Sequence, residues 1–286
     1  MGRGSNYLIK SIEMSKVNEE LTRETFTPKS PKGPKTAYGS AVDTTNPYLK
    51  LADENSDKTE EDYVRLIFYG GSKKHDDLFK RAAIQVNDDY QVKVEPEHFY
   101  QIVDATTIVD TINSFDQSTI QSVDIFCHGG PEALYFKKGR NDLYKNNDVR
   151  RYYQVANYKS KTLDDIDYGA FTESAKIELH GCNSGSLDIE DENFEPFAEL
   201  MSEKLSGAGK GNAVVIAHGT KANPNAHKTL DGDDYRHSLR RVFNGGENLF
   251  RTKKEGRLTA TDINKFLRKK EDDGENYDGA SSVLEK

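Results

Sequence analysis

The chain contains 286 residues, of which 31% are charged and 35% are hydrophobic, and its formal net charge is −8. This length suits one large domain or two small ones, and the acidic balance gives no indication of a nucleic-acid partner. Two cysteines cannot form a disulfide framework, so they indicate a reducing compartment or a secreted enzyme with a functional thiol.

Neither a membrane span nor a secretory signal is predicted. The sequence has no run of about 18 apolar residues, which a transmembrane helix would need. The first residues lack the apolar core of a signal peptide, and Asn6 stands where a myristoylation sequence has Ser or Thr. We therefore expect a cytoplasmic protein, or one exported by a specialised secretion system.

Three regions are predicted along the chain. Residues 1–60 are rich in Thr, Ser, Lys and Glu with little apolar periodicity, which predicts a flexible leader or pro-segment. Residues 61–270 are expected to form one α/β domain. The acidic residues 271–286 are expected to form a fraying tail.

The first half of the domain alternates strand and helix patterns. Residues 64–71 form an apolar run ending in Gly-Gly, which predicts a buried parallel strand. Residues 75–86 and 106–117 have helical spacing of apolar side chains. Residues 90–96 and 122–130 are predicted strands, and the second of these also ends in Gly-Gly.

The second half continues this alternation after a polar insert at residues 137–170, which is expected to form loops and a hairpin. Strands with their exit loops are predicted at residues 175–186 and 212–225, and helices at residues 194–207, 233–244 and 259–270. This alternation predicts a three-layer α/β sandwich, with a mostly parallel sheet between helices.

Three of the predicted strands end in the same dipeptide. The three dipeptides are His128-Gly129, His180-Gly181 and His218-Gly219. Ligands of open α/β sheets bind beyond the carboxyl ends of the strands. We therefore expect all three exits to meet at one edge of the sheet and to form a site there.

The second exit adds a thiol, Cys182. A cysteine near a histidine from a neighbouring strand has the arrangement that nucleophilic catalysis needs, because the imidazole promotes the reactive thiolate. His128 is the expected partner, and the backbone amides of Gly129 and Cys182 are the expected oxyanion hole. Cys127 precedes His128 on a strand and is expected to face the opposite side and pack in the core.

These motifs resemble the caspase–hemoglobinase superfamily of clan CD cysteine peptidases. The order of histidine and cysteine matches, and their separation of 54 residues is close to the roughly 50 of caspases. The segment HGCNSGSL at 180–187 resembles legumains and separases, and lacks the Arg-Gly that follows the caspase nucleophile. The segment FCHGGPEAL at 126–134 resembles legumain-like and bacterial toxin-associated members.

The resemblance implies a caspase-like sandwich and a thiol protease, a hydrolase that works through a Cys–His dyad and an acyl-enzyme. The dyad maps onto His128 and Cys182, and no cofactor is required. Calcium activation, known among metacaspase-like members, would draw on the acidic stretches 188–195 and 231–234. The expected partner is a protein or peptide substrate, including the chain's own leader or insert, as in autoprocessing or in a bacterial toxin or defence effector.

Further residues near the exits are candidates for a substrate pocket, and TKANP at 220–224 resembles the pocket-wall loop of legumains. The candidates are His180, Asn183, Ser184, His218, Thr220, Lys221 and Asn223.

Two other interpretations stay open at this point. A caspase-like fold can lose its activity and serve as a binding module. Alternatively, the three histidines and Cys182 could converge as a zinc site at the sheet edge, since His and Cys are preferred zinc ligands, although no local ligand spacing supports this.

Overall fold

The computed structural model describes a central α/β unit of the chain. The described residues are 63–72, 74–89, 94–136, 141–153, 159–187, 194–222, 236, 239–253, 256–258 and 263. The predicted leader and tail therefore lie outside the described residues, as does the predicted helix at 259–270 apart from the buried Ile263.

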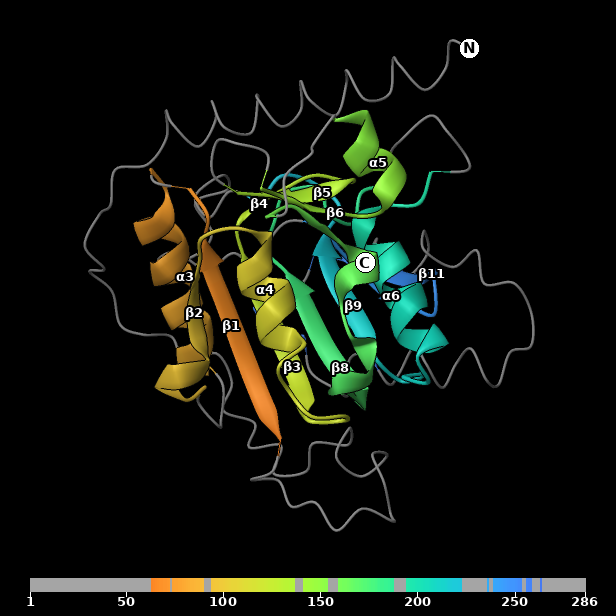
Figure 1. Ribbon diagram of the computed structural model, residues 1–286, viewed down its shortest axis with the longest axis horizontal. Helices are drawn as coiled ribbons and strands as arrows, with labels where there is room; N and C mark the ends of the chain where they lie inside the picture. Colours follow the sequence, from red (N-terminus) through yellow and green to blue (C-terminus); the bar gives the residue numbers. More distant parts are fainter. Residues whose placement is uncertain are drawn as a thin grey trace.

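A seven-stranded sheet forms the centre (Figure 1). In spatial order its strands are β11 (Glu247–Thr252), β10 (Arg240–Asn244), β9 (Val214–His218), β8 (Phe171–Leu179), β3 (Ile120–Phe126), β1 (Val64–Gly70) and β2 (Phe99–Ile102). The run from β9 to β2 is parallel, and β10 and β11 are antiparallel additions. The predicted mostly parallel sheet is confirmed.

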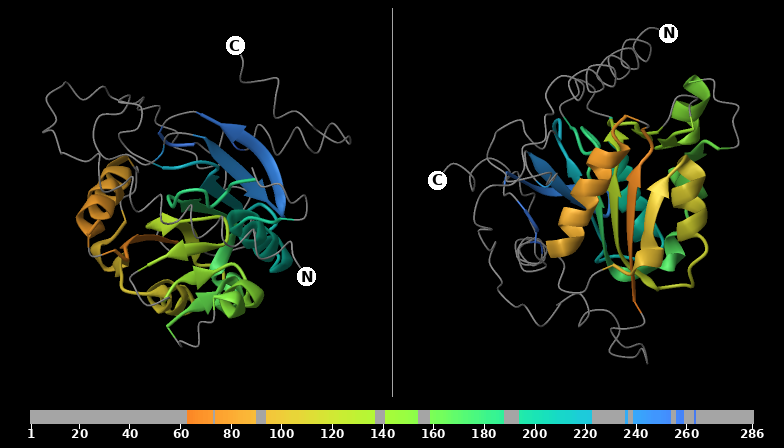
Figure 2. Two further views of the ribbon diagram at one scale, coloured as in Figure 1. Left: turned by 90° about the horizontal axis from the view of Figure 1, so that it is seen from above. Right: turned by 90° about the vertical axis from the view of Figure 1, so that its left-hand side faces the viewer.

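Helices cover both faces of this sheet (Figure 2). Helix α3 (Asp76–Asp89) packs on β1 and β3 from one side, where Phe79 and Ala82 join the apolar cluster around Ile67. Helices α4 (Ala105–Ile112) and α6 (Phe197–Gly207) pack on the opposite face. Helix α4 begins where the side chain of Asp104 accepts a hydrogen bond from the Thr106 amide, which satisfies a free donor of the first turn.

A second, small sheet stands beyond the carboxyl ends of the main strands (Figure 1). It consists of β4 (His128–Gly129), β5 (Ala133–Tyr135), β6 (Leu143–Tyr144) and β7 (Lys161–Thr162). The short helix α5 (Asn147–Tyr152) and the 3₁₀ helices η3 (Leu163–Asp165) and η4 (Tyr168–Ala170) complete this region. The two described strands within the expected hairpin at 137–170 are β6 and β7, which pair in parallel, and the antiparallel β4–β5 pair comes before that range.

Two predicted elements differ from the structure. Residues 90–93 of the strand expected at 90–96 lie outside the described residues, Val94 and Glu95 are not in a strand, and Pro96 opens the 3₁₀ helix η2 (Pro96–His98) before β2, because proline cannot donate to a sheet ladder. The helix expected at 233–244 is wrong at its end, where Arg240–Asn244 is strand β10. Strand β10 turns into β11 through Gly245 and Gly246, both at positive φ, which is hairpin geometry.

Within the described residues, no helix is both long enough and apolar enough to cross a membrane.

Candidate active site

The three His-Gly exits lie at one edge of the main sheet, as predicted. Strands β3, β8 and β9 are consecutive neighbours and run parallel, so their carboxyl ends point the same way (Figure 1). His180 donates its backbone N–H to Ile125 on β3, and Gly185 donates to His218 at the end of β9. The loop after β8 is thereby held between the two other exits.

Two glycines bring the exits of β3 and β8 into backbone contact. A Cβ added at Gly129 would lie 2.8 Å from Gly181 Cα and 3.1 Å from the carbonyl oxygen of Cys182. A Cβ added at Gly181 would lie 3.0 Å from Gly129 Cα. Any side chain at either position would force the two segments apart, so these glycines are what allow the residues beside them, His128 and Cys182, to share one corner of the fold.

Cys182 lies in a tight turn beneath the loop that follows β9. Its Sγ is 3.2 Å from the backbone nitrogen of Ala222, which donates to it, and its side chain is only 8% exposed. The next residue, Asn183, has φ of 56° and donates its N–H to Thr220. The left-handed conformation at Asn183 is the sharp bend that turns the chain back after Cys182.

The environment keeps the resting thiol protonated. Burial raises the pKa of Cys182, although the Ala222 N–H and the charge of Lys221 act in the opposite direction. Cys127 lies on the other side of the sheet, in the cluster beneath α4 and α6, and burial raises its pKa further. Both cysteines are free, and Cys127 packs in the core as predicted.

His128 lies on the same side of the sheet as Cys182. Its ring meets the ring of Phe79 edge-on at a centroid distance of 5.1 Å, and Phe79 belongs to the same apolar cluster as Cys182. His128 makes its side-chain hydrogen bond with His75, whose Nδ1 is 3.0 Å from His128 Nε2. Burial, and then the neighbouring His75, lower the pKa of His128 to about 4, so the imidazole is neutral at physiological pH.

The two expected oxyanion donors are close to each other. Gly129 pairs with Leu134 next to the hydrogen bond from Gly130 N–H to Ala133 O, and bonded and non-bonded pairs alternate in antiparallel ladders. The Gly129 N–H therefore faces away from β5, and its nitrogen is 3.2 Å from the site of a Gly181 Cβ. Within the described residues, the Cys182 N–H donates to no backbone carbonyl.

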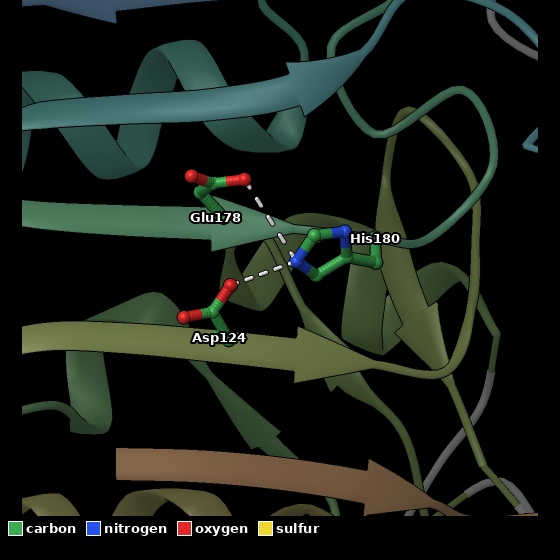
Figure 3. A group of neighbouring side chains, drawn as sticks. All are labelled: Asp124, Glu178 and His180. Atoms are coloured by element: carbon green, nitrogen blue, oxygen red, sulfur yellow. Dashed lines mark hydrogen bonds and ion pairs between the residues drawn. The ribbon is translucent and has the colours of Figure 1, made fainter. Parts of the chain in front are cut away.

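A buried polar group lies directly behind this corner (Figure 3). His180 Nε2 is 2.8 Å from Asp124 Oδ1 and 3.9 Å from Glu178 Oε2, and all three side chains are at most 2% exposed. The His180 ring also stacks on Phe126, at 4.0 Å between centroids and 5° between planes. The residue two before Cys182 is thus packed against the residue two before His128.

This group is electrically compensated by cations of the same face. Lys176 Nζ is 2.7 Å from Glu178 Oε1, and an Arg240 nitrogen is 3.7 Å from Glu178 Oε2. Burial alone would raise the pKa of Glu178, but Lys176, His180, Arg240 and Arg236 outweigh it and hold the pKa well below its usual range. The group therefore forms an internal ion network rather than an uncompensated cation site.

The zinc arrangement considered above is not formed. Across the described ranges, the one group of three or more potential ligands within 4.8 Å of one another is Asp124, Glu178 and His180. It contains neither His128, His218 nor Cys182. The acidic stretches proposed for calcium lie almost entirely outside the described residues.

The predicted pocket residues occupy different places. His180, Asn183, Ser184 and His218 are all buried, and Ser184 Oγ donates to the Gly181 carbonyl and braces the turn. Lys221 is exposed, Thr220 is partly buried, and Asn223 lies outside the described residues. Among the described candidates, Thr220 and Lys221 are therefore the two that are not buried.

Sequence reasoning missed three contributors, His75, Ala222 and Asp124. His75 follows the Gly70-Gly71 exit of β1, a neighbour of β3, so this exit belongs to the same edge. Asp124 lies at an alternate position within an apolar strand, and this is a signal for a buried partner. Ala222 acts through its backbone and left no signal in the sequence.

Comparisons with known protein families, with curated proteins and with solved structures found no match.

Proposed function

We propose that this chain is a cysteine peptidase with a caspase-like fold, in which Cys182 is the nucleophile and His128 its proton-transfer partner. The observation that carries the proposal is the contact of Gly129 with Gly181, which joins the exits of two parallel strands. A thiol, an imidazole and the backbone amides of Gly129 and Cys182 thereby adjoin the edge where α/β sheets bind ligands, which supports the proposal. The resemblance of the same segments to clan CD peptidases supports it.

The resting dyad consists of a neutral thiol and a neutral imidazole, since the pKa of Cys182 is raised and that of His128 is lowered to about 4. In the proposed reaction His128 takes the thiol proton as Sγ bonds to the substrate carbonyl carbon. The Gly129 and Cys182 amides stabilise the oxyanion. The amine then leaves with the proton from His128, and water releases the acyl group from Cys182.

The substrate of this reaction is a protein or peptide. Lys221, exposed beside the nucleophile loop, and Thr220 would form the nearest wall of its binding site. The leader at 1–60 and the Lys/Asn-rich part of the insert at 137–162 are candidate cleavage segments, which would make the protein a self-processing enzyme or a bacterial effector. We expect no cofactor in the chemical step, and calcium as an activator to be tested.

The test is intact-protein mass after incubation with peptidyl acyloxymethyl-ketone probes, with and without calcium. The wild type and Cys127→Ala should each gain one probe, and Cys182→Ala should gain none. Cys127→Ala is the matched control because both cysteines are buried and free. His128→Ala should also gain none while keeping the wild-type melting temperature.

A non-catalytic binding module is the second candidate, and the burial of Cys182 favours it. A scaffold needs no accessible thiol, whereas a peptidase must expose Sγ to a substrate. Absence of labelling at Cys182 by every probe, with a folded wild type, would contradict the peptidase proposal and favour the scaffold.

A further inference from the structure

His75 is the described side chain in hydrogen-bond contact with His128, and it comes from a third strand exit. The chain leaves β1 through Gly70 and Gly71, at φ of 108° and 81°, conformations that glycine adopts without strain. A Cβ at Gly71 would lie 2.7 Å from the ring of Phe136. These two glycines turn the chain across the end of β3, and α3 starts immediately afterwards.

The backbone around His75 is fixed on both sides. His75 N–H donates to Ser72 O at 3.0 Å, and its own carbonyl accepts from Phe79 in the first turn of α3. The Ser72 amide donates to Asp76 Oδ1 at 2.8 Å. The ring is 7% exposed, so its position is set by packing and local hydrogen bonds rather than by solvent.

The two imidazoles meet in an oriented pair. His75 Nδ1 and His128 Nε2 are 3.0 Å apart, and the rings are inclined at 74°. Phe79 faces both rings edge-on, at 5.1 Å from His128 and 6.5 Å from His75. His128 is therefore held at one nitrogen by His75 and across its ring by Phe79.

A contact of this length between neutral imidazoles requires that one nitrogen donates and the other accepts. If His128 Nε2–H donates, its Nδ1 carries the lone pair and is the nitrogen that can take a proton. The same arrangement orients the base in nucleophilic triads, where a third group fixes the imidazole without accepting its proton.

We propose that His75 is a positioning residue for His128: its Nδ1 accepts the Nε2 proton of His128 and so keeps the His128 Nδ1 lone pair for Cys182. The inference rests on the proposed peptidase function. During attack the thiol proton moves from Cys182 Sγ to His128 Nδ1, and from there to the leaving amine. No proton passes to His75, which accepts the same hydrogen bond before and after the transfer.

His75 is the side chain that interacts with the His128 ring nitrogen, whereas the neighbouring carboxylate of Asp76 has other partners. Asp76, the first residue of α3, uses Oδ1 for the Ser72 amide and Oδ2 for the Gln101 side chain. Burial and His75 are the two causes that lower the pKa of His128. The part due to His75 is the repulsion that a charged His75 exerts, whereas a neutral His75 that accepts the Nε2 proton stabilises the charged form of His128.

The first measurement is a long-range ¹H–¹⁵N spectrum of the histidine side chains in the full chain, with His128 assigned from a His128→Gln variant. The wild type should show His128 protonated at Nε2. His75→Asn, which offers an acceptor oxygen near the position of Nδ1, should keep this tautomer. His75→Phe, which keeps the ring and loses the acceptor, should show a mixture. A wild-type His128 protonated at Nδ1, or no change in His75→Phe, would overturn the proposal.

The second measurement is the rate of Cys182 alkylation by the ketone probe as a function of pH. His75→Phe should react about 10–100-fold more slowly at every pH, and His75→Asn should recover most of the rate. His98→Phe, on η2 and in contact with Phe115, is the control and should match the wild type. If the wild-type tautomer is as proposed while Cys182 is inert, the peptidase proposal fails and the positioning of His128 stands.

Discussion

The two faces of the main sheet carry different kinds of buried side chain. The face under α4 and α6 is apolar along the neighbouring strands β3 and β8, with Val123, Ile125, Ile177 and Leu179 all at most 1% exposed. The alternate positions of the same strands carry Asp124, Lys176, Glu178 and His180 on the other face. Because adjacent residues of a strand point to opposite faces, a step of one residue along β3 or β8 leads from the hydrophobic core to the ion network.

This difference indicates which face of the sheet stabilises the fold and which face leads to the candidate site. Burial of apolar surface stabilises the fold on the α4 and α6 face without regard to direction. The opposite face is organised by directional contacts that lead to the exits, from Asp124 through His180 to the stacked Phe126. Substitutions on the two faces should therefore have different signatures.

The largest effect is expected when the ion network loses its shared carboxylate. Glu178→Gln leaves the buried Arg240 and the partly buried Lys176 without their anion, which should lower the free energy of unfolding by about 3–5 kcal/mol. Urea denaturation measures it. Glu173→Gln, exposed on the same strand, is the control and should change little. A decrease in the free energy of unfolding smaller than that caused by deleting one core methyl group would show that these charges do not depend on Glu178.

The glycine contact should be the next most sensitive feature. Gly129→Ala places a methyl group against Gly181 and should cost about 1–3 kcal/mol through overpacking. Probe labelling of Cys182 should be lost in the molecules that stay folded, because the two exits are pushed apart. Gly207→Ala, where no atom lies within 4 Å of the added Cβ, is the matched control. Labelling at the wild-type rate in Gly129→Ala would contradict the proposed oxyanion hole.

A smaller change separates the apolar face from the chemistry. Ile125→Val removes one buried methylene and should lower stability by about 0.5–1.5 kcal/mol. The labelling rate of Cys182 in the folded protein should be unchanged, since Ile125 faces α4 and α6. A labelling rate that falls with stability would show that the two faces are mechanically coupled.

The smallest expected effect depends on pH and lies on α6. Burial, and then the charges of Glu195 and Glu203, raise the pKa of Glu199 to about 7 from its ordinary 4.5. Between these values the folded protein binds a proton that the unfolded chain does not, so stability falls as pH rises through about 7. Glu199→Gln should raise the melting temperature by roughly 2 °C at alkaline pH.

The same variant should gain nothing at a pH below the ordinary pKa of glutamate, where both states are protonated. Asp110→Asn, exposed on α4, is the control for removal of a charge and should show no such pH dependence. Equal gains for Glu199→Gln at acid and alkaline pH would contradict a raised pKa.

Much of the parallel sheet could be predicted from the sequence, because β1, β3, β8 and β9 are rich in apolar residues and each is followed within three residues by glycine. The exits of β3, β8 and β9 follow from that pattern together with the parallel topology. Strand β10 could not be predicted in the same way. Arg240 and Arg241 are buried, at 1% and 6% exposure, although arginine is usually exposed. The residue types of this segment therefore gave no indication that it is a buried strand.

The candidate site was predictable to the extent that its residues adjoin the motifs. His128 and Cys182 lie beside glycines whose role is local and visible in the sequence. His75 is 53 residues from His128, and only the pairing of β1 with β3 brings them together. The ion network likewise depends on the register of β3 against β8, which places Asp124 opposite Glu178 and which residue types alone do not specify.

The amide of Ala222 that donates to Cys182 Sγ has a consequence for how the protein meets oxidants. Since Cys182 is 8% exposed, a peroxide or alkylating agent that needs wider access to this sulfur requires the N–H···S bond to break and residues 220–222 to move aside. When such opening is fast relative to the reaction, the observed rate is the intrinsic rate multiplied by the open fraction. The oxidation lifetime of this thiol therefore measures the opening equilibrium of the loop after β9, and a substrate that holds the loop open would sensitise the thiol to peroxide.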